Sequence, residues 1–195
     1  MPSETCPSSS LRHRLRTSTA EAHARLDRDA SGYDLQTLAG YRRFLELSAA
    51  ALLPLEASLV DAGVSRIFPD WPARSRRHAI LDDLADLDGE FDPLPPPGPL
   101  DLGGVLGTMY VLEGSRLGAR LLLNTVEESA DPEIVGATAY LRHGAGQGLW
   151  PSFLAALEDH AASLRDYSSA VSAAVRAFEL FERAAAGRPR EKVLA

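Results

Sequence analysis

The sequence of 195 residues has little cysteine, little lysine and few β-branched side chains. Its single cysteine, Cys6, excludes an intramolecular disulfide and any zinc or cluster site built from several cysteines. Ile, Val and Thr together supply only 19 residues, whereas Ala and Leu are abundant, so a β-rich fold is disfavoured. These shortages predict an all-α protein suited to a reducing compartment.

Charge and hydropathy exclude two further classes of protein. The 20 basic and 27 acidic side chains give a net charge of −7, which argues against a general nucleic-acid-binding protein. The longest apolar run, Ala49–Leu53, is too short to cross a bilayer, and no signal peptide is recognisable. We therefore expect a cytoplasmic protein without a membrane partner. Because 19 of the 20 basic residues are arginines, any bound anion is expected to meet guanidinium groups.

Helical periodicity predicts one domain over residues 11–186, between a flexible N-terminal tail, residues 1–10, and a C-terminal tail, residues 187–195. The proline-rich segment Asp92–Asp101 is expected to be extended. The first expected helix covers residues 11–29, and the second is capped by Asp34, passes a kink at Pro54 and ends at Gly63. A third runs from about Pro72 through Leu87, and a fourth begins at Asp101. The remaining three are expected over residues 132–141, from Leu149 onward, and from Ser163 or Asp166 to Ala186.

The helix expected after Asp101 contains five glycines, each of which costs about 1 kcal/mol relative to alanine inside a helix. Gly103, Gly107, Gly114 and Gly118 fall along one face of this helix. A bare face of this kind permits close packing against a second helix. It also permits a flat ligand to lie on the backbone, with a kink at Gly114–Ser115. Both interpretations stay open at this point.

His23 lies in the apolar stripe of the first expected helix. A lone histidine in such a stripe is commonly a core residue whose polar atoms are satisfied. It also suits the proximal ligand of a haem iron, and Asp27, one turn later, would accept the other ring N–H and fix the tautomer. His23 on one side and the glycine face on the other would then enclose a flat apolar ligand.

Two stretches resemble motifs of a known family. TAEAHARLD around His23 and MYVLEGSRLGARLL, Met109–Leu122, are similar to the proximal and distal helices of bacterial haem oxygenases, in particular the type found beside bacterial phytochromes. The similarity extends from Leu11 to Ala186. It implies a single-domain, all-α haem oxygenase-like fold that holds haem between a proximal helix and a kinked, glycine-rich distal helix.

The resemblance also implies a reaction. Haem b is substrate and cofactor: with dioxygen and electrons it is opened at a meso carbon, releasing biliverdin, carbon monoxide and ferrous iron. The haem supplies most of this chemistry, and the protein supplies orientation and a proton path. The sequence has no flavin, nicotinamide or cluster motif, so an external ferredoxin or flavoprotein reductase is expected as electron donor. A bacteriophytochrome is a candidate acceptor of the biliverdin.

The resemblance assigns roles to individual residues. His23 matches the proximal iron ligand, and the backbone of Gly114 and Gly118 is expected against the macrocycle, with water near Ser115 in the distal pocket. The expected contacts to the cofactor periphery are Arg16, Tyr110, Phe178 and Phe181. The acidic electron donor is expected to dock on Arg12, Arg14 and Arg16.

Three other functions compete with this one. A haem storage or sensor protein would need the same residues without degrading the haem. A thiaminase-like enzyme would need a cysteine in its pocket, and Cys6 lies in the expected tail. A helical interaction module would use the glycine face as a docking groove and leave His23 incidental. Trp150 is expected in the core.

Overall fold

The computed structural model describes residues 10–30 and 32–187, and within these ranges it contains helices and no β-strand. The predicted all-α fold is confirmed. Cys6 and nearly all of both predicted tails lie outside the described residues. The helical segments are α1 (Leu11–Ala30), α2 (Leu38–Asp61), η1 (Val64–Arg66), α3 (Trp71–Arg74), α4 (Arg77–Asp86), α5 (Leu102–Glu127), α6 (Pro132–Gly136), α7 (Ala139–Arg142), α8 (Leu149–Ala161) and α9 (Ser168–Ala186).

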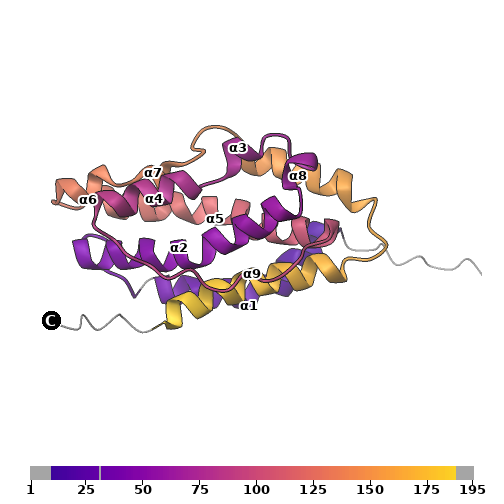
Figure 1. The fold of residues 1–195 in the computed structure, drawn as a ribbon, viewed down its shortest axis with the longest axis horizontal. Coiled ribbons are helices and arrows are strands. Elements are labelled where there is room, and N and C mark those ends of the chain that lie inside the picture. The colour runs from indigo at the N-terminus through magenta and orange to yellow at the C-terminus, as the bar shows by residue number, and fades with distance from the viewer. Residues whose placement is uncertain (1–9, 31, 188–195) are drawn as a thin grey trace, which may run out of the picture.

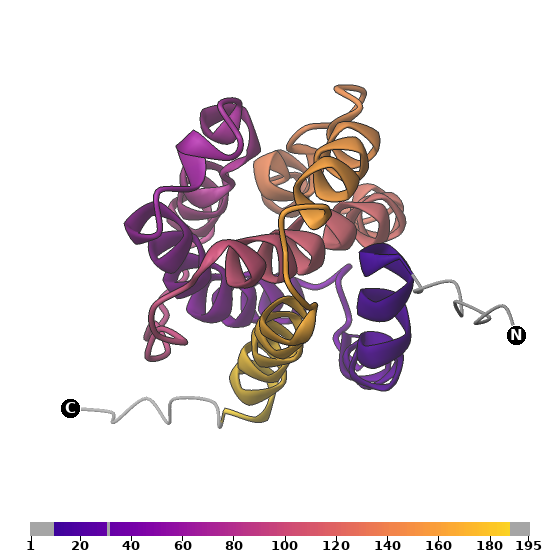
Figure 2. The ribbon, with the colours of Figure 1, turned by 90° about the vertical axis from the view of Figure 1, so that its right-hand side faces the viewer.

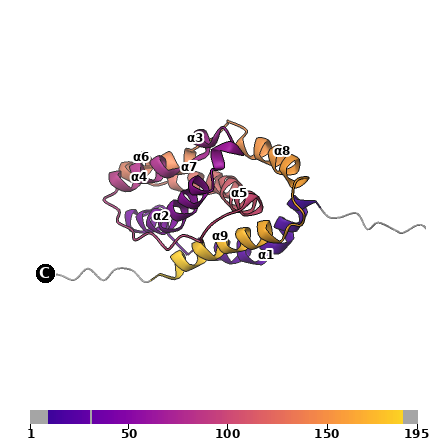
Figure 3. The ribbon, with the colours of Figure 1, turned by 45° about the vertical axis from the view of Figure 1, so that its right-hand side comes forward.

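Helix α5 runs through the middle of the molecule (Figure 1). It packs most extensively on α9, which also packs on α1 and α2. Figure 2 and Figure 3 show α1 and α9 together on one side of α5, with α3 and α8 on the other side. Helix α1 makes its main contacts with α9 and α8, so a space remains between α1 and α5. None of the described helices combines the length and the apolar character needed to span a membrane.

The start of α5 is fixed as the sequence predicts. Asp101 is its N-cap, and the Asp101 carboxylate accepts a hydrogen bond of 2.7 Å from the amide of Gly104. The next glycine faces α9 so closely that a β-carbon at position 107 would lie 2.8 Å from the carbonyl carbon of Ala170. The first part of the glycine face is therefore a close contact between helices.

The N-terminal cap of α2 differs from the prediction. The cap of α2 is Thr37, whose hydroxyl accepts from the amide of Gly40 at 3.3 Å, and not Asp34. The carbonyl of Asp34 instead accepts from the amide and the hydroxyl of Thr37 in the preceding turn. Helix α2 continues past Pro54. The kinks expected at Pro54 and at Gly114–Ser115 stay predictions.

The helix predicted from Pro72 through Leu87 is two helices, α3 and α4. The break occurs where Glu56, a buried carboxylate of α2, accepts hydrogen bonds from the Ser75 hydroxyl at 2.5 Å and the Arg76 amide at 2.7 Å. These bonds hold Ser75 in an extended conformation, with a ψ of 133°. A carboxylate distant in sequence thus interrupts a helix that local periodicity favours.

The helix predicted over 132–141 is also divided, into α6 and α7. Buried Asp83 of α4 accepts from the amides of Ala139 and Tyr140, both at 2.8 Å, and so caps α7. The hydroxyl of Tyr41 donates to the carbonyl of Ala137 at 2.7 Å. Burial raises the pKa of Asp83 to about 6 because charge is costly there. The last helix begins at Ser168, slightly later than expected.

Candidate functional site

A cavity of about 610 Å³ opens between α1 and α5, with α2, α7, α8 and α9 completing its walls. This volume is typical of small-molecule and cofactor sites. The predicted site residues that line the cavity are His23, Tyr110, Gly114, Ser115, Gly118, Phe178 and Phe181. Arg16 is exposed on α1 and is not among the lining residues.

His23 faces the cavity from α1. Its side chain is 62% exposed, so the interpretation of His23 as a satisfied core residue is wrong. Its Nδ1 lies 2.9 Å from a carboxylate oxygen of Asp27, which leaves Nε2 as the ring nitrogen available to a ligand. The ring centroid lies 6.0 Å from that of Phe178, which provides an apolar neighbour.

Gly114 and Gly118 line the cavity from α5. A β-carbon at position 118 would meet no atom within 4 Å, and one at position 114 would meet only the ring of Trp150, at 3.7 Å. Helix packing therefore does not require these two glycines, in contrast to Gly107. The glycine face has two parts, of which the first contacts α9 and the second leaves bare backbone toward the cavity. This bare backbone fits a flat ligand.

Arg76, which sequence reasoning missed, also lines the cavity although it is only 2% exposed. Its Nη2 donates to the carbonyl of Leu112 and to the hydroxyl of Ser115, both at 3.0 Å. Its guanidinium lies 5.1 Å from the ring centroid of Tyr140, a cation–π distance. A fixed cation thus stands beside Ser115. No local signal marked it, because Arg76 falls inside the helix predicted from Pro72 through Leu87, where an arginine is normally exposed.

The edge of the cavity near Tyr110 has a positive environment. Burial raises the pKa of Tyr110, and the charges of Arg12 and Arg16 act in the opposite direction. These two arginines of α1 are therefore close enough to influence a lining residue. Trp150, expected in the core, also lines the cavity, and its ring is tilted by 54° to that of Tyr110, with the centroids 5.7 Å apart.

Sequence reasoning also missed the wall that α2 contributes. Its lining residues are Phe44, Leu47 and Ser48. Apolar residues of α2 that pack in the core and those that line the cavity look alike in the sequence, so the pattern did not distinguish them. None of the described lining residues is a cysteine. The described residues likewise contain no group of three or more His, Cys, Asp or Glu that could hold a metal ion.

No protein-family model matches the chain. Similar individual proteins, in contrast, all belong to one family. The haem oxygenase PigA of Pseudomonas aeruginosa is 30% identical over 174 residues, which cover 86% of this chain and 87% of that protein. A haem oxygenase of Xanthomonas campestris pv. campestris is 28% identical over 154 residues, covering 77% of this chain and 91% of that protein.

A solved structure shows the same fold. The NO- and CO-bound haem oxygenase from Neisseria meningitidis aligns with a TM-score of 0.75 and 24% sequence identity, and the alignment covers 91% of each chain. The fold is therefore that of a haem oxygenase, as the two motifs of the sequence predict.

Proposed function

The chain belongs to the bacterial haem oxygenase family, and we propose that it cleaves haem with dioxygen and electrons to biliverdin, carbon monoxide and ferrous iron. One observation carries this proposal. His23, with Nε2 available, and the bare backbone of Gly114 and Gly118 line the same cavity, from α1 and from α5. This pairing suits a flat macrocycle with a central metal.

His23 is the proposed iron ligand. Asp27, with a carboxylate oxygen 2.9 Å from Nδ1, is the proposed acceptor of a hydrogen bond from Nδ1–H, which would fix the tautomer and make the opposite nitrogen a better electron donor. Phe178 and Phe181 line the cavity and provide apolar contacts to the macrocycle. The haem, when bound, supplies the redox chemistry, and the chain supplies the orientation.

The distal side is proposed to orient a proton donor. Gly114 and Gly118 allow close approach to the helix backbone, and Ser115 supplies a hydroxyl that already accepts from Arg76 at 3.0 Å. Arg76 carries five N–H donors, and its Nη2 donates to Leu112 and Ser115; we propose that a water in the cavity accepts from another of them. A fixed guanidinium of this kind can hold a water near the substrate without itself giving up a proton.

The haem propionates are proposed to meet the positive edge of the cavity. Tyr110 offers a hydroxyl there, and Arg16 offers a guanidinium from the exposed side of α1. An acidic ferredoxin or flavoprotein reductase is the proposed electron donor, docking on Arg12, Arg14 and Arg16. If changing these three arginines to glutamate left turnover with a protein donor unchanged, this docking site would be wrong. Delivery of biliverdin to a bacteriophytochrome in the cytoplasm is the further expectation.

Titration of the purified protein with haemin, followed by a reductant under air, tests the proposed reaction. Loss of the Soret band together with the rise of biliverdin absorbance is the expected result. A haem complex that survives many equivalents of reductant would instead indicate a storage or sensor protein.

A further inference from the structure

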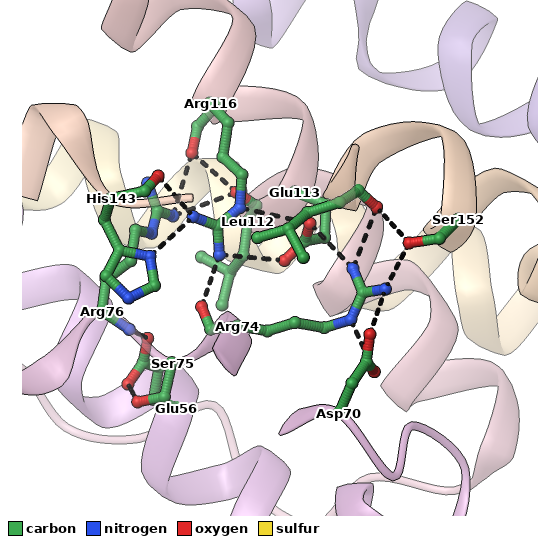
Figure 4. Close-up of polar contacts among 12 residues, drawn as sticks. Glu56, Asp70, Arg74, Ser75, Arg76, Leu112, Glu113, Arg116, His143 and Ser152 are labelled. Carbon is green, nitrogen blue, oxygen red and sulfur yellow. Dashed lines mark hydrogen bonds and ion pairs between the residues drawn. The ribbon is translucent and has the colours of Figure 1, made fainter. Parts of the chain in front are cut away.

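Behind the cavity-facing turn of α5 lies a buried cluster of charged residues that the proposed reaction does not use (Figure 4). Its centre is Glu113, which is 1% exposed and contacts two guanidinium groups. Arg74 of α3 reaches it with a hydrogen bond of 3.0 Å, and Arg116, three residues further along α5, contacts both carboxylate oxygens at 3.1 and 3.2 Å. Neither Glu113 nor Arg116 lines the cavity.

Arg74 connects this cluster to α8 and to the surface. It donates to the carbonyl of Leu149 at 3.0 Å and to the hydroxyl of Ser152 at 2.8 Å. It also pairs with both oxygens of Asp70, at 2.8 Å each. The bidentate pair with Asp70 restricts rotation of the Arg74 guanidinium. Because this guanidinium also binds Glu113 of α5 and two residues of α8, it connects α3, α5 and α8.

Arg116 connects the same turn of α5 to the loop before α8. It donates to the carbonyl of Arg74 and, at 3.2 Å, to the carbonyl of His143. Its Nη1 also lies 3.1 Å from Nδ1 of His143, which must be the acceptor because a guanidinium only donates. Burial, Arg116 and Arg76 lower the pKa of His143 to about 4, which keeps this acceptor neutral.

The position of the cluster along α5 is informative. Glu113 and Arg116 flank Gly114 and Ser115, on the turn where the helix offers bare backbone to the cavity. The tight contact of α5 with α9 involves Gly107, two turns earlier, and does not extend to Gly118, where a β-carbon would meet no atom within 4 Å. The cavity-facing turn therefore depends on its rear side chains for its position.

We propose that Glu113 and Arg116, together with Arg74, are positioning residues that hold the Gly114–Gly118 turn at a fixed distance from His23. This inference rests on the proposed function insofar as the turn serves a bound haem. The cluster acts through the backbone of α5 and does not touch the ligand. Glu113 is the carboxylate that Arg74 and Arg116 share, so loss of either arginine leaves this buried carboxylate with one guanidinium partner fewer.

Hydrogen exchange of the ligand-free protein tests the inference directly. In Arg116→Gln, the amides of residues 110–119 should exchange about tenfold faster, while those of α1, α2 and α9 keep their rates. Arg120→Gln, which removes an exposed arginine of the same helix, should change neither set. Equal acceleration along the whole chain, or no acceleration at 110–119, would overturn the proposal.

A second, less disruptive variant separates a local effect on α5 from general unfolding. Asp70→Asn removes a carboxylate that is 48% exposed, at the outer end of the cluster. It should accelerate exchange in residues 110–119 by less than Arg116→Gln does, and nowhere else. Acceleration confined to α3 would count against a connection to α5.

The haemin complexes of the same variants give a second readout. The spectrum of the reduced complex without added ligand should stay that of wild type in Arg116→Gln, because ligation by His23 is unaffected. Dissociation of carbon monoxide from this complex, measured without oxygen, should change by about tenfold. An unchanged rate would contradict the proposal. A wild-type complex that binds haemin without degrading it would refute the oxygenase function alone, and the exchange experiment would still decide the positioning role.

Discussion

The two parts of the glycine face in α5 predict opposite effects of the same substitution. Gly107→Ala places a β-carbon against the backbone of Ala170, whose carbonyl carbon would be 2.8 Å away and its oxygen nearer still. Gly118→Ala places a β-carbon where no atom lies within 4 Å. The two variants therefore form a matched pair on one helix, one at a helix contact and one at the cavity.

The magnitudes follow from packing and helix propensity. Alanine favours a helix over glycine by about 1 kcal/mol, so Gly118→Ala should raise the free energy of unfolding by up to about 1 kcal/mol. In Gly107→Ala the same gain is outweighed, because carbon atoms need roughly 3.5 Å and α9 must move away. Overpacking of this kind costs about 1–3 kcal/mol or more, so net destabilisation is expected.

Chemical denaturation of the ligand-free proteins, followed by circular dichroism, measures both changes. Haemin titration of Gly118→Ala should show weaker binding than wild type despite the greater stability, since the added methyl group occupies the ligand side. Destabilisation by Gly118→Ala as large as that by Gly107→Ala would refute the division of the glycine face. Haemin affinity equal to that of wild type in Gly118→Ala would refute its role at the cavity.

Three further predictions concern single side chains. His23→Ala should leave the unfolding free energy nearly unchanged, because the side chain is 62% exposed, but should remove the wild-type axial ligation from the haemin spectrum. The pKa of Asp83 is about 6 in the folded protein and 3.8 in the unfolded chain, so the folded state holds this proton to a higher pH. The free energy of unfolding should therefore fall by about 3 kcal/mol as the pH rises from 3.8 to 6. Denaturation of Asp83→Asn over this range should lack that slope, and an identical slope would contradict the assignment. The lowered pKa of His143, about 4, predicts the opposite sign, with stability lost as the pH falls from 6.5 to 4, and His143→Gln should flatten that dependence.

The sequence predicted those features of the fold that depend on local pattern. The extent of α1, the start of α5 after Asp101 and the all-helical class follow from periodicity and composition, and the motif resemblance identified His23 and Gly114 as residues of one site. The same pattern failed where a distant carboxylate intervenes. Glu56 and Asp83 each bind backbone amides of another segment and divide a predicted helix.

The cavity-side position of Arg76 was unpredictable for the same physical reason. Its side chain is buried because Glu56 holds its own amide, while Leu112 and Ser115 accept from its guanidinium. These partners lie 20 to 39 residues away along the chain. Propensity and periodicity report the surroundings of a residue within a few turns. Contacts of this range need the tertiary structure.

The reaction is tested most directly by the carbon monoxide that it releases. The one-to-one haemin complex is reduced under air in a closed vessel, and the gas is trapped by an excess of ferrous globin. The account predicts about one equivalent of carbon monoxide for each haem consumed, together with biliverdin. Intact haem without carbon monoxide would contradict it.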